Sequence, residues 1–141
     1  MQDLKVKKLR DNARIDPPFY LGDAGYDVYS TINLTLEPLD RMNIPLGLAL
    51  EFDASHICLV QGKSGIAHNL GLDTIGNIID SSYRGEIHVQ IINVSNKSVL
   101  LKKGMKIAQL IFVRVNTPEI KFVDDLIPSD RGIKCFGSSG N

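Results

Sequence analysis

A short stretch in the middle of the chain gathers the side chains best suited to chemistry. Asp80 ends an apolar run that begins after Gly76, and Tyr83 and Arg84 follow before a second apolar run leaves at Ile87. This arrangement is typical of a β-hairpin whose turn holds a carboxylate, an aromatic ring and a cation. A carboxylate in a rigid turn can act as the base that activates water. The alternative is an Asx turn beside a core tyrosine, and this stretch alone leaves both interpretations open.

Two further turns place charged groups beside glycine. Asp27 follows Gly25 at the start of a strand, where a carboxylate is more often a turn former. Lys63 and Ser64 lie in a glycine-flanked turn that opens a short helical segment. Backbone N–H groups at a helix start, together with a lysine, suit a phosphate, whereas Ser64 could equally be an ordinary N-cap.

Polar groups also stand in two less usual places. Gln109 lies inside an otherwise apolar strand, where its buried amide needs partners such as a phosphate or a metal-bound water. The C-terminal segment combines Arg131, Phe136, Ser138 and Ser139 with several glycines. Arginine suits a terminal phosphate, an aromatic ring can stack on a base, and Gly-Ser-Ser-Gly can surround an anion with donors. A flexible linker is the competing interpretation of such a tail.

Composition narrows the class of protein. The chain has 141 residues, 43% of them hydrophobic, which indicates one globular domain. Lysine plus arginine and aspartate plus glutamate number 16 each, and this zero net charge argues against a stable nucleic-acid partner. No apolar run reaches the roughly 18 residues of a membrane span, and the first residues lack a signal-peptide pattern, so we expect a cytoplasmic, intracellular protein. The two cysteines, Cys58 and Cys135, form neither a disulfide framework nor a zinc spacing.

Hydrophobic periodicity predicts an all-β fold. Alternation over Leu46 to Phe52 and over Ile87 to Ile92 predicts half-buried strands, and Ile107 to Val115 is expected to be buried on both sides. Only Ser64 to Leu70 has helical spacing, which argues against a parallel α/β sheet. We therefore expect a barrel or sandwich over residues 1–127, followed by a mobile arm over residues 128–141.

Together, five of these segments resemble, in order and with normal spacing, the five motifs of the trimeric deoxyuridine triphosphate nucleotidohydrolases, the dUTPases. The similarity covers the chain from Ala24 to Gly140. The segments are Ala-Gly-Tyr-Asp at 24–27, Gly-Lys-Ser-Gly-Ile-Ala at 62–67, Ile-Asp-Ser-Ser-Tyr-Arg-Gly at 79–85, Gly-Met-Lys-Ile-Ala-Gln-Leu-Ile at 104–111 and Arg-Gly-Ile-Lys-Cys-Phe-Gly-Ser-Ser-Gly at 131–140.

The resemblance implies a fold and a reaction. The fold is a jelly-roll-like β-barrel of the dUTPase, or β-clip, type with a flexible C-terminal arm, assembled as a homotrimer whose sites draw on more than one subunit. The reaction is hydrolysis of dUTP to dUMP and pyrophosphate, with Mg²⁺ on the triphosphate. Such an enzyme limits uracil incorporation into DNA and supplies dUMP for thymidylate synthesis.

The resemblance also implies a role for each motif residue. Asp80 would activate the attacking water, and Tyr83 would pack on the deoxyribose and exclude a ribose. The hairpin with Thr74, Asn77 and Ile79 would bind uracil and leave no room for the thymine methyl. Asp27 would act near the metal through water. Lys63, Ser64, Gln109 and Arg131 would hold phosphates, Phe136 would cover the uracil, and Ser138 and Ser139 would bind the phosphate chain. Gly65 and Gly137 are the remaining substrate-binding residues.

The sequence departs from the family pattern in four places. Lys63 stands where arginine is usual and gives up bidentate geometry. Asn77 replaces a glycine, which we expect the hairpin to accept because asparagine tolerates left-handed backbone. Lys134 and Cys135 replace two glycines before Phe136, and Ser139 replaces threonine while keeping the hydroxyl.

Two alternatives to a dUTP-hydrolysing enzyme stay open. A regulatory module would keep the nucleotide pocket and use it as a switch for a protein partner, and a dCTP deaminase would use the same fold with a deaminating acid–base set. The intact Asp80 favours hydrolysis over the first, because a binder needs no base. The motif around Tyr83 and the Gly-Ser-Ser-Gly tail favour it over the second.

Overall fold

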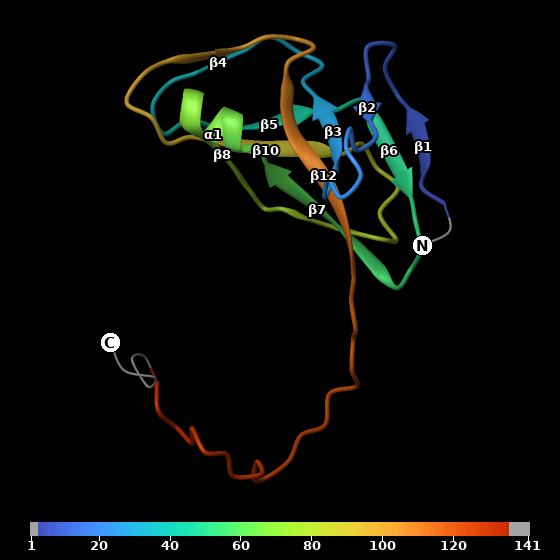
Figure 1. Cartoon of the computed structure of the whole chain (residues 1–141), viewed down its shortest axis with the longest axis vertical. Helices are drawn as coiled ribbons and strands as arrows, with labels where there is room; N and C mark the ends of the chain where they lie inside the picture. Colours follow the sequence, from blue (N-terminus) through green and yellow to red (C-terminus); the bar gives the residue numbers. More distant parts are fainter. Residues whose placement is uncertain (1–2, 136–141) are drawn as a thin grey trace.

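The computed structural model describes residues 3–135; residues 1–2 and 136–141 lie outside the described part. Within it the chain forms strands and one short helix (Figure 1). In chain order these are β1 (Lys5–Lys8), β2 (Ile15–Asp16), β3 (Tyr26–Tyr29), β4 (Leu34–Leu36), β5 (Arg41–Pro45), β6 (Leu48–Glu51), β7 (His56–Gly62), α1 (Ser64–Leu70), β8 (Leu72–Ile75), β9 (Ile78–Asp80), β10 (His88–Asn93), β11 (Val99–Leu101) and β12 (Lys106–Arg114). The all-β prediction is confirmed, and α1 has the predicted bounds.

The strands pair antiparallel in four sheets around one core. The largest has the order β2-β3-β12-β7-β9, a second has the order β5-β10-β8, and β1-β6 and β11-β4 form two-stranded ribbons. The long strand β12 lies between β3 and β7. It therefore holds three of the predicted site segments in one sheet.

The core consists of the inward positions that alternation predicted. Leu46, Leu48 and Leu50 on or beside β6 are buried. Ala49 is buried as well, so the expectation that this strand is only half-buried is wrong. On β10, Val89 and Ile91 are buried, as is Ile87 just before the strand. His88, which lies between Ile87 and Val89, is exposed. Each fully buried aliphatic side chain contributes roughly 1.5–3 kcal/mol by leaving water, so these positions fix the register of both sheets.

Strand β12 departs from the prediction in its second half. Ile107, Ala108 and Leu110 are fully buried, but Val113 and Arg114 are exposed. The strand extends beyond the sheet's covered region, because its last pairings are with the outer end of β7 at Ile57 and His56. The expectation of burial on both sides up to Val115 is therefore wrong for the last part of the strand.

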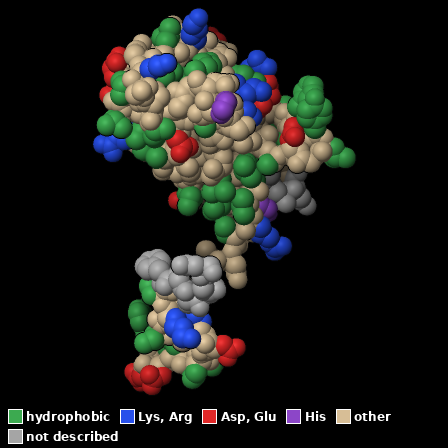
Figure 2. All heavy atoms as spheres, turned by 60° about the vertical axis from the view of Figure 1, so that its left-hand side comes forward, with side chains coloured by type: hydrophobic (Ala, Val, Ile, Leu, Met, Phe, Trp, Pro, Cys, Tyr) green, Lys and Arg blue, Asp and Glu red, His purple; other side chains and the backbone are tan. Residues whose placement is uncertain are grey.

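After β12 the chain leaves the folded body. Residues 116–135 are exposed and run away from the sheets as an extended tail, orange to red in Figure 1. Large apolar side chains on this tail face solvent (Figure 2). Among them are Phe122, which is 97% exposed, and Ile127, which is 94% exposed. The boundary between domain and arm at residue 128 stays a prediction. No helix among residues 3–135 combines the length and apolar character needed to cross a membrane.

Candidate active site

The first part of the candidate site is a cluster of two lysines on one aspartate. Asp27 Oδ1 accepts from Lys63 Nζ at 2.5 Å, and Asp27 Oδ2 accepts from Lys106 Nζ at 2.5 Å. The cluster carries one net positive charge from two ammonium groups and one carboxylate. It can therefore attract an anion, provided the anion displaces Asp27 from one of the lysines.

The register of the central sheet explains this cluster. Gln109 on β12 lies opposite Asp27 on β3 and opposite Gln61 on β7. Its amide Nε2 lies 3.5 Å from the carbonyl oxygen of Gly62. A Cβ added to Gly25 would meet the carbonyl oxygen of Leu110 at 2.8 Å, so glycine is required for β3 to approach β12 this closely. The predicted site segments at residues 24–27, 62–67 and 104–111 thus meet at Gln109.

The ammonium groups of Lys63 and Lys106 keep the Asp27 carboxyl ionised. Partial burial alone would raise the pKa of this carboxyl, but hydrogen bonds from Lys106 and Lys63 outweigh burial and hold the pKa below its usual range. A lowered folded-state pKa stabilises the folded chain above the ordinary aspartate value of about 3.9. That contribution is lost as the pH falls through the lowered pKa. At neutral pH Asp27 is therefore anionic.

Sequence reasoning missed Lys106. Strict alternation places Lys106 and Gln109 on opposite faces of β12. A β-bulge between Lys106 and Ala108 changes this, since Lys106 pairs with Tyr29 and Gln109 pairs with Asp27, two positions on one face of β3. The basic residue in the fourth motif was the available signal.

The start of α1 leaves Ser64 available. Lys63 is the N-cap residue and makes no side-chain capping bond, so the interpretation of Ser64 as the N-cap is wrong. A Cβ on Gly65 would meet nothing within 4 Å, so open space lies over this turn. Ser64 therefore lies beside Lys63 at the helix start, as the sequence predicts.

The second part of the candidate site is an open pocket of about 380 Å³ over the β8–β9 connection, β9 and the turn that follows it. The predicted hairpin is not formed, because β9 pairs with β7 whereas β8 and β10 pair with each other in another sheet. Asp80, Tyr83 and Ile79 line it, and the Tyr83 N–H donates to the Asp80 carbonyl at 3.0 Å across the turn. Within residues 3–135 the Asp80 carboxylate makes no hydrogen bond or ion pair, whereas the Arg84 guanidinium donates to the carbonyl of Ser81 at 2.6 Å. Asp80 is free to bind water, and Arg84 closes the turn.

The connection between β8 and β9 accepts Asn77 for a reason other than the expected one. The left-handed residue is Gly76, at φ 64, and Asn77 does not have a positive φ. The Asn77 amide Nδ2 donates to the Thr74 carbonyl at 3.3 Å, while its Oδ1 is buried without a partner. Thr74 is itself buried in β8. The expectation that Asn77 adopts left-handed backbone is therefore wrong.

The two parts lie far apart in one chain. Asp80 on β9 pairs with Ile57 near the start of β7, whereas Lys63 follows the last residue of β7, Gly62. Six residues of strand separate these positions, which corresponds to about 20 Å. Within one copy, Asp80 and Lys63 therefore lie at opposite ends of β7.

Of the predicted tail residues, only Arg131 lies in the described part of the chain, and it contacts the tail itself. Arg131 is exposed and donates to the carbonyl of Lys134 at 3.0 Å and to that of Cys135 at 3.1 Å. Phe136, Gly137, Ser138 and Ser139 were also predicted to bind substrate, and they lie outside the described residues.

Comparison with known proteins decides the family. The sequence matches the dUTPase family over residues 11–140. The chain belongs to the dUTPase family. It is 37% identical over 137 residues to the deoxyuridine 5′-triphosphate nucleotidohydrolase of swinepox virus (strain Kasza), covering 97% of this chain and 96% of that protein. The corresponding protein of Paramecium bursaria Chlorella virus 1 is 33% identical over 140 residues, 99% of each chain.

Solved structures confirm the predicted dUTPase-like fold. A mutant dUTPase of Staphylococcus bacteriophage 80alpha with dUpNHpp has a TM-score of 0.90 and 30% identity, covering all of both chains. A mutant dUTPase of phage phi11 of S. aureus, which shows the coordination of a structural Mg(II) ion, has a TM-score of 0.84 and 25% identity over 89% of this chain and 99% of that chain.

The side chains around Asp27 determine how the protein could hold a metal ion. Within residues 3–135 no group of three or more histidine, cysteine, aspartate or glutamate residues could hold a metal ion. Both oxygens of Asp27 already accept from lysines. This donor set fits a magnesium ion carried by substrate phosphates, with Asp27 reaching it through water, and does not fit an all-protein cage.

Proposed function

We propose that this dUTPase-family chain hydrolyses dUTP to dUMP and pyrophosphate as a homotrimer, thereby limiting uracil incorporation into DNA and supplying dUMP for thymidylate synthesis. The observation that carries the proposal is the pocket in which the free Asp80 carboxylate lies beside Tyr83. The full-length similarity to deoxyuridine 5′-triphosphate nucleotidohydrolases supports the same substrate.

Asp80 acts on the water in this mechanism. Its carboxylate is held by the backbone turn rather than by its own side-chain contacts, because the Tyr83 N–H bonds the Asp80 carbonyl. The carboxylate can accept a proton from a water that attacks the α-phosphorus. Departure of pyrophosphate then leaves dUMP in the pocket.

The β8–β9 segment and Tyr83 determine which nucleotide enters. Uracil would contact the backbone around Thr74, Asn77 and Ile79, leaving no room for the thymine methyl. The Tyr83 ring would lie against the deoxyribose where a ribose 2′-hydroxyl would clash. Rejection by steric exclusion is stronger than selection by one favourable methyl contact.

The cation cluster binds the triphosphate. Lys63, Ser64 and Gln109 would contact phosphate oxygens from the β7–α1 turn and β12, with Arg131 supplied by the tail. Lys106 keeps Asp27 paired when Lys63 turns to a phosphate, because it occupies the other carboxylate oxygen. Magnesium bound to the triphosphate supplies charge neutralisation during phosphoryl transfer.

A second copy must contribute to each site. Asp80 and Lys63 are about 20 Å apart along β7, which favours a site that takes the two groups from different copies. The tail supports assembly as well, because its exposed Phe122 and Ile127 gain a dry environment only against another surface. A homotrimer with shared sites satisfies both observations.

Pyrophosphate release tests the proposal directly. We expect rapid Mg²⁺-dependent release from dUTP and little from dCTP, dTTP or UTP. Tight dUTP binding without release would support the regulatory alternative, and formation of dUTP from dCTP would support a deaminase.

A regulatory role is the second candidate function. It is favoured by a structural neighbour with dUpNHpp, at TM-score 0.89, which is a phage dUTPase that controls transfer of virulence genes.

Replacement of Tyr83 tests the sugar pocket. We expect Tyr83→Ala to lower the preference for dUTP over UTP by about 10-fold or more, because the ring that excludes the 2′-hydroxyl is gone. The measurement is the ratio of kcat/KM for the two nucleotides. An unchanged ratio would refute the sugar role of Tyr83.

Removal of the tail tests its contribution to catalysis. We expect deletion of Arg131 to Asn141 to lower kcat/KM for dUTP about 100-fold, since a phosphate ligand and the cover over the base are lost. Size-exclusion chromatography should show the same oligomer, because Phe122 and Ile127 stay in the chain. A fully active truncation would show that the arm is dispensable.

A further inference from the structure

Glu86 is the best-fixed side chain at the edge of the Asp80 pocket, although none of the family motifs includes it. It follows Gly85 at the end of the third motif and lines the same pocket as Asp80 and Tyr83. Arg10, 76 residues earlier in the chain, donates to it through Nε at 2.9 Å and through Nη2 at 3.3 Å. This bidentate geometry is the strong form of an arginine–carboxylate pair.

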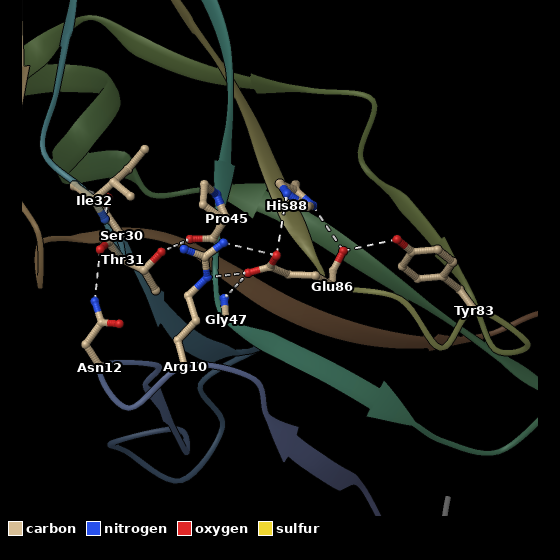
Figure 3. A network of polar contacts seen from close by, with 10 residues as sticks. All are labelled: Arg10, Asn12, Ser30, Thr31, Ile32, Pro45, Gly47, Tyr83, Glu86 and His88. Atoms are coloured by element: carbon tan, nitrogen blue, oxygen red, sulfur yellow. Dashed lines mark hydrogen bonds and ion pairs between the residues drawn. The ribbon is translucent and has the colours of Figure 1, made fainter.

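A third donor bonds this carboxylate, and His88 lies beside it with its Nε2 4.0 Å from Glu86 Oε2. The Gly47 N–H donates to Glu86 Oε1 at 3.0 Å (Figure 3). The loop that carries Gly47 is itself fixed, because the Thr31 hydroxyl donates to the Pro45 carbonyl at 2.6 Å. The hydrogen bond from Arg10 and the one from Gly47 both hold the pKa of Glu86 below its usual range despite partial burial. Glu86 thus joins the N-terminal segment, the β5–β6 loop and the third motif.

The backbone of Glu86 in turn fixes Tyr83. The Tyr83 hydroxyl donates to the Glu86 carbonyl at 3.1 Å, as Figure 3 shows. The ring folds directly over Gly85, where an added Cβ would lie 2.4 Å from the Tyr83 hydroxyl oxygen. The ring position therefore depends on where the chain runs at residues 85 and 86.

We infer that Arg10 and Glu86 are positioning residues for nucleotide selection: their ion pair holds the Glu86 backbone, and thereby the Tyr83 ring, in the orientation that excludes a ribose. This inference rests on the proposed function, which assigns the sugar contact to Tyr83. Arg10 does not line the pocket, so it acts through Glu86 and Tyr83.

Substitution of Arg10 should loosen this selection. We expect Arg10→Ala to lower the ratio of kcat/KM for dUTP to kcat/KM for UTP about fivefold. This is the effect expected from losing the hydrogen-bonded ion pair that holds the Glu86 backbone and the Tyr83 ring in place. Arg10→Lys should fall between the wild type and Arg10→Ala, because lysine keeps the charge but not the two-pronged contact. Lys8→Ala is the matched control: this exposed cation, two residues away, makes no side-chain hydrogen bond or ion pair within residues 3–135, and its removal should leave the ratio unchanged.

A double substitution separates positioning from general stabilisation. In a Tyr83→Ala background, Arg10→Ala should produce no further change in the dUTP-to-UTP ratio, because the group it positions is absent. A full additional effect in that background, or an unchanged ratio for Arg10→Ala alone despite a lowered Tm, would overturn the inference. If the wild type does not hydrolyse dUTP, the proposed function fails first, and the two failures are thereby distinguished.

Discussion

Replacing Asp80 by asparagine is expected to lower kcat for dUTP about 1,000-fold while KM changes by no more than about threefold, since general-base catalysis contributes roughly 10²–10⁴-fold. The carboxamide has nearly the same size and can still accept a hydrogen bond from water, but it cannot take up the proton. The pocket shape is preserved, because the Asp80 side chain makes no hydrogen bond or ion pair within residues 3–135. Steady-state pyrophosphate release gives kcat and KM, and calorimetric titration with a non-hydrolysable dUTP analogue gives the affinity.

Asp11→Asn is a suitable control for this substitution. Asp11 is an exposed aspartate that also lacks side-chain partners within the described residues, so its amide variant changes the net charge by the same amount. It should keep full activity. If Asp80→Asn retains more than about a tenth of the wild-type kcat, the assignment of Asp80 as the base is contradicted.

The sequence predicted individual strands and the helix well, because the residues that determine each of them lie close together in the chain. The period-two alternation around Leu46 to Phe52 places leucines on the buried side of β6, and the helical spacing of Ser64 to Leu70 corresponds to α1. Asp80 and Tyr83 were predicted to lie together because only a turn separates them. The hydrogen bond across that turn confirms the prediction.

Features that depend on register or on distant pairs could not be predicted. The bulge that brings Lys106 onto the face of Asp27 adds one residue to β12, and alternation carries no sign of it. The contact between Arg10 and Glu86 joins positions 76 residues apart. The separation of Asp80 from Lys63 follows from the pairing of β9 with the first half of β7, which the sequence of either strand does not specify.

That separation predicts that two inactive variants will restore each other's activity. Asp80→Asn and Lys63→Ala are each expected to lose at least about 100-fold in kcat/KM, because one lacks the base and the other a phosphate ligand. When the two are mixed, unfolded and refolded together, a site that takes Asp80 from one copy and Lys63 from another can have both native residues. Random pairing gives this combination in about a quarter of the sites, so activity should recover to about a quarter of the wild-type value.

The same experiment carries its own control. Asp80→Asn refolded with the double variant Asp80→Asn/Lys63→Ala supplies no native Asp80, so this mixture should stay inactive whatever the assembly. Lys63→Ala is expected to fold, because Asp27 keeps its ion pair with Lys106. If the single-variant mixture also stays inactive although mixed oligomers form, Asp80 and Lys63 act within one chain, and β7 would have to bend or re-pair to close the roughly 20 Å between them. Recovery instead would show that the register of β9 on β7 forces the site onto the interface between copies.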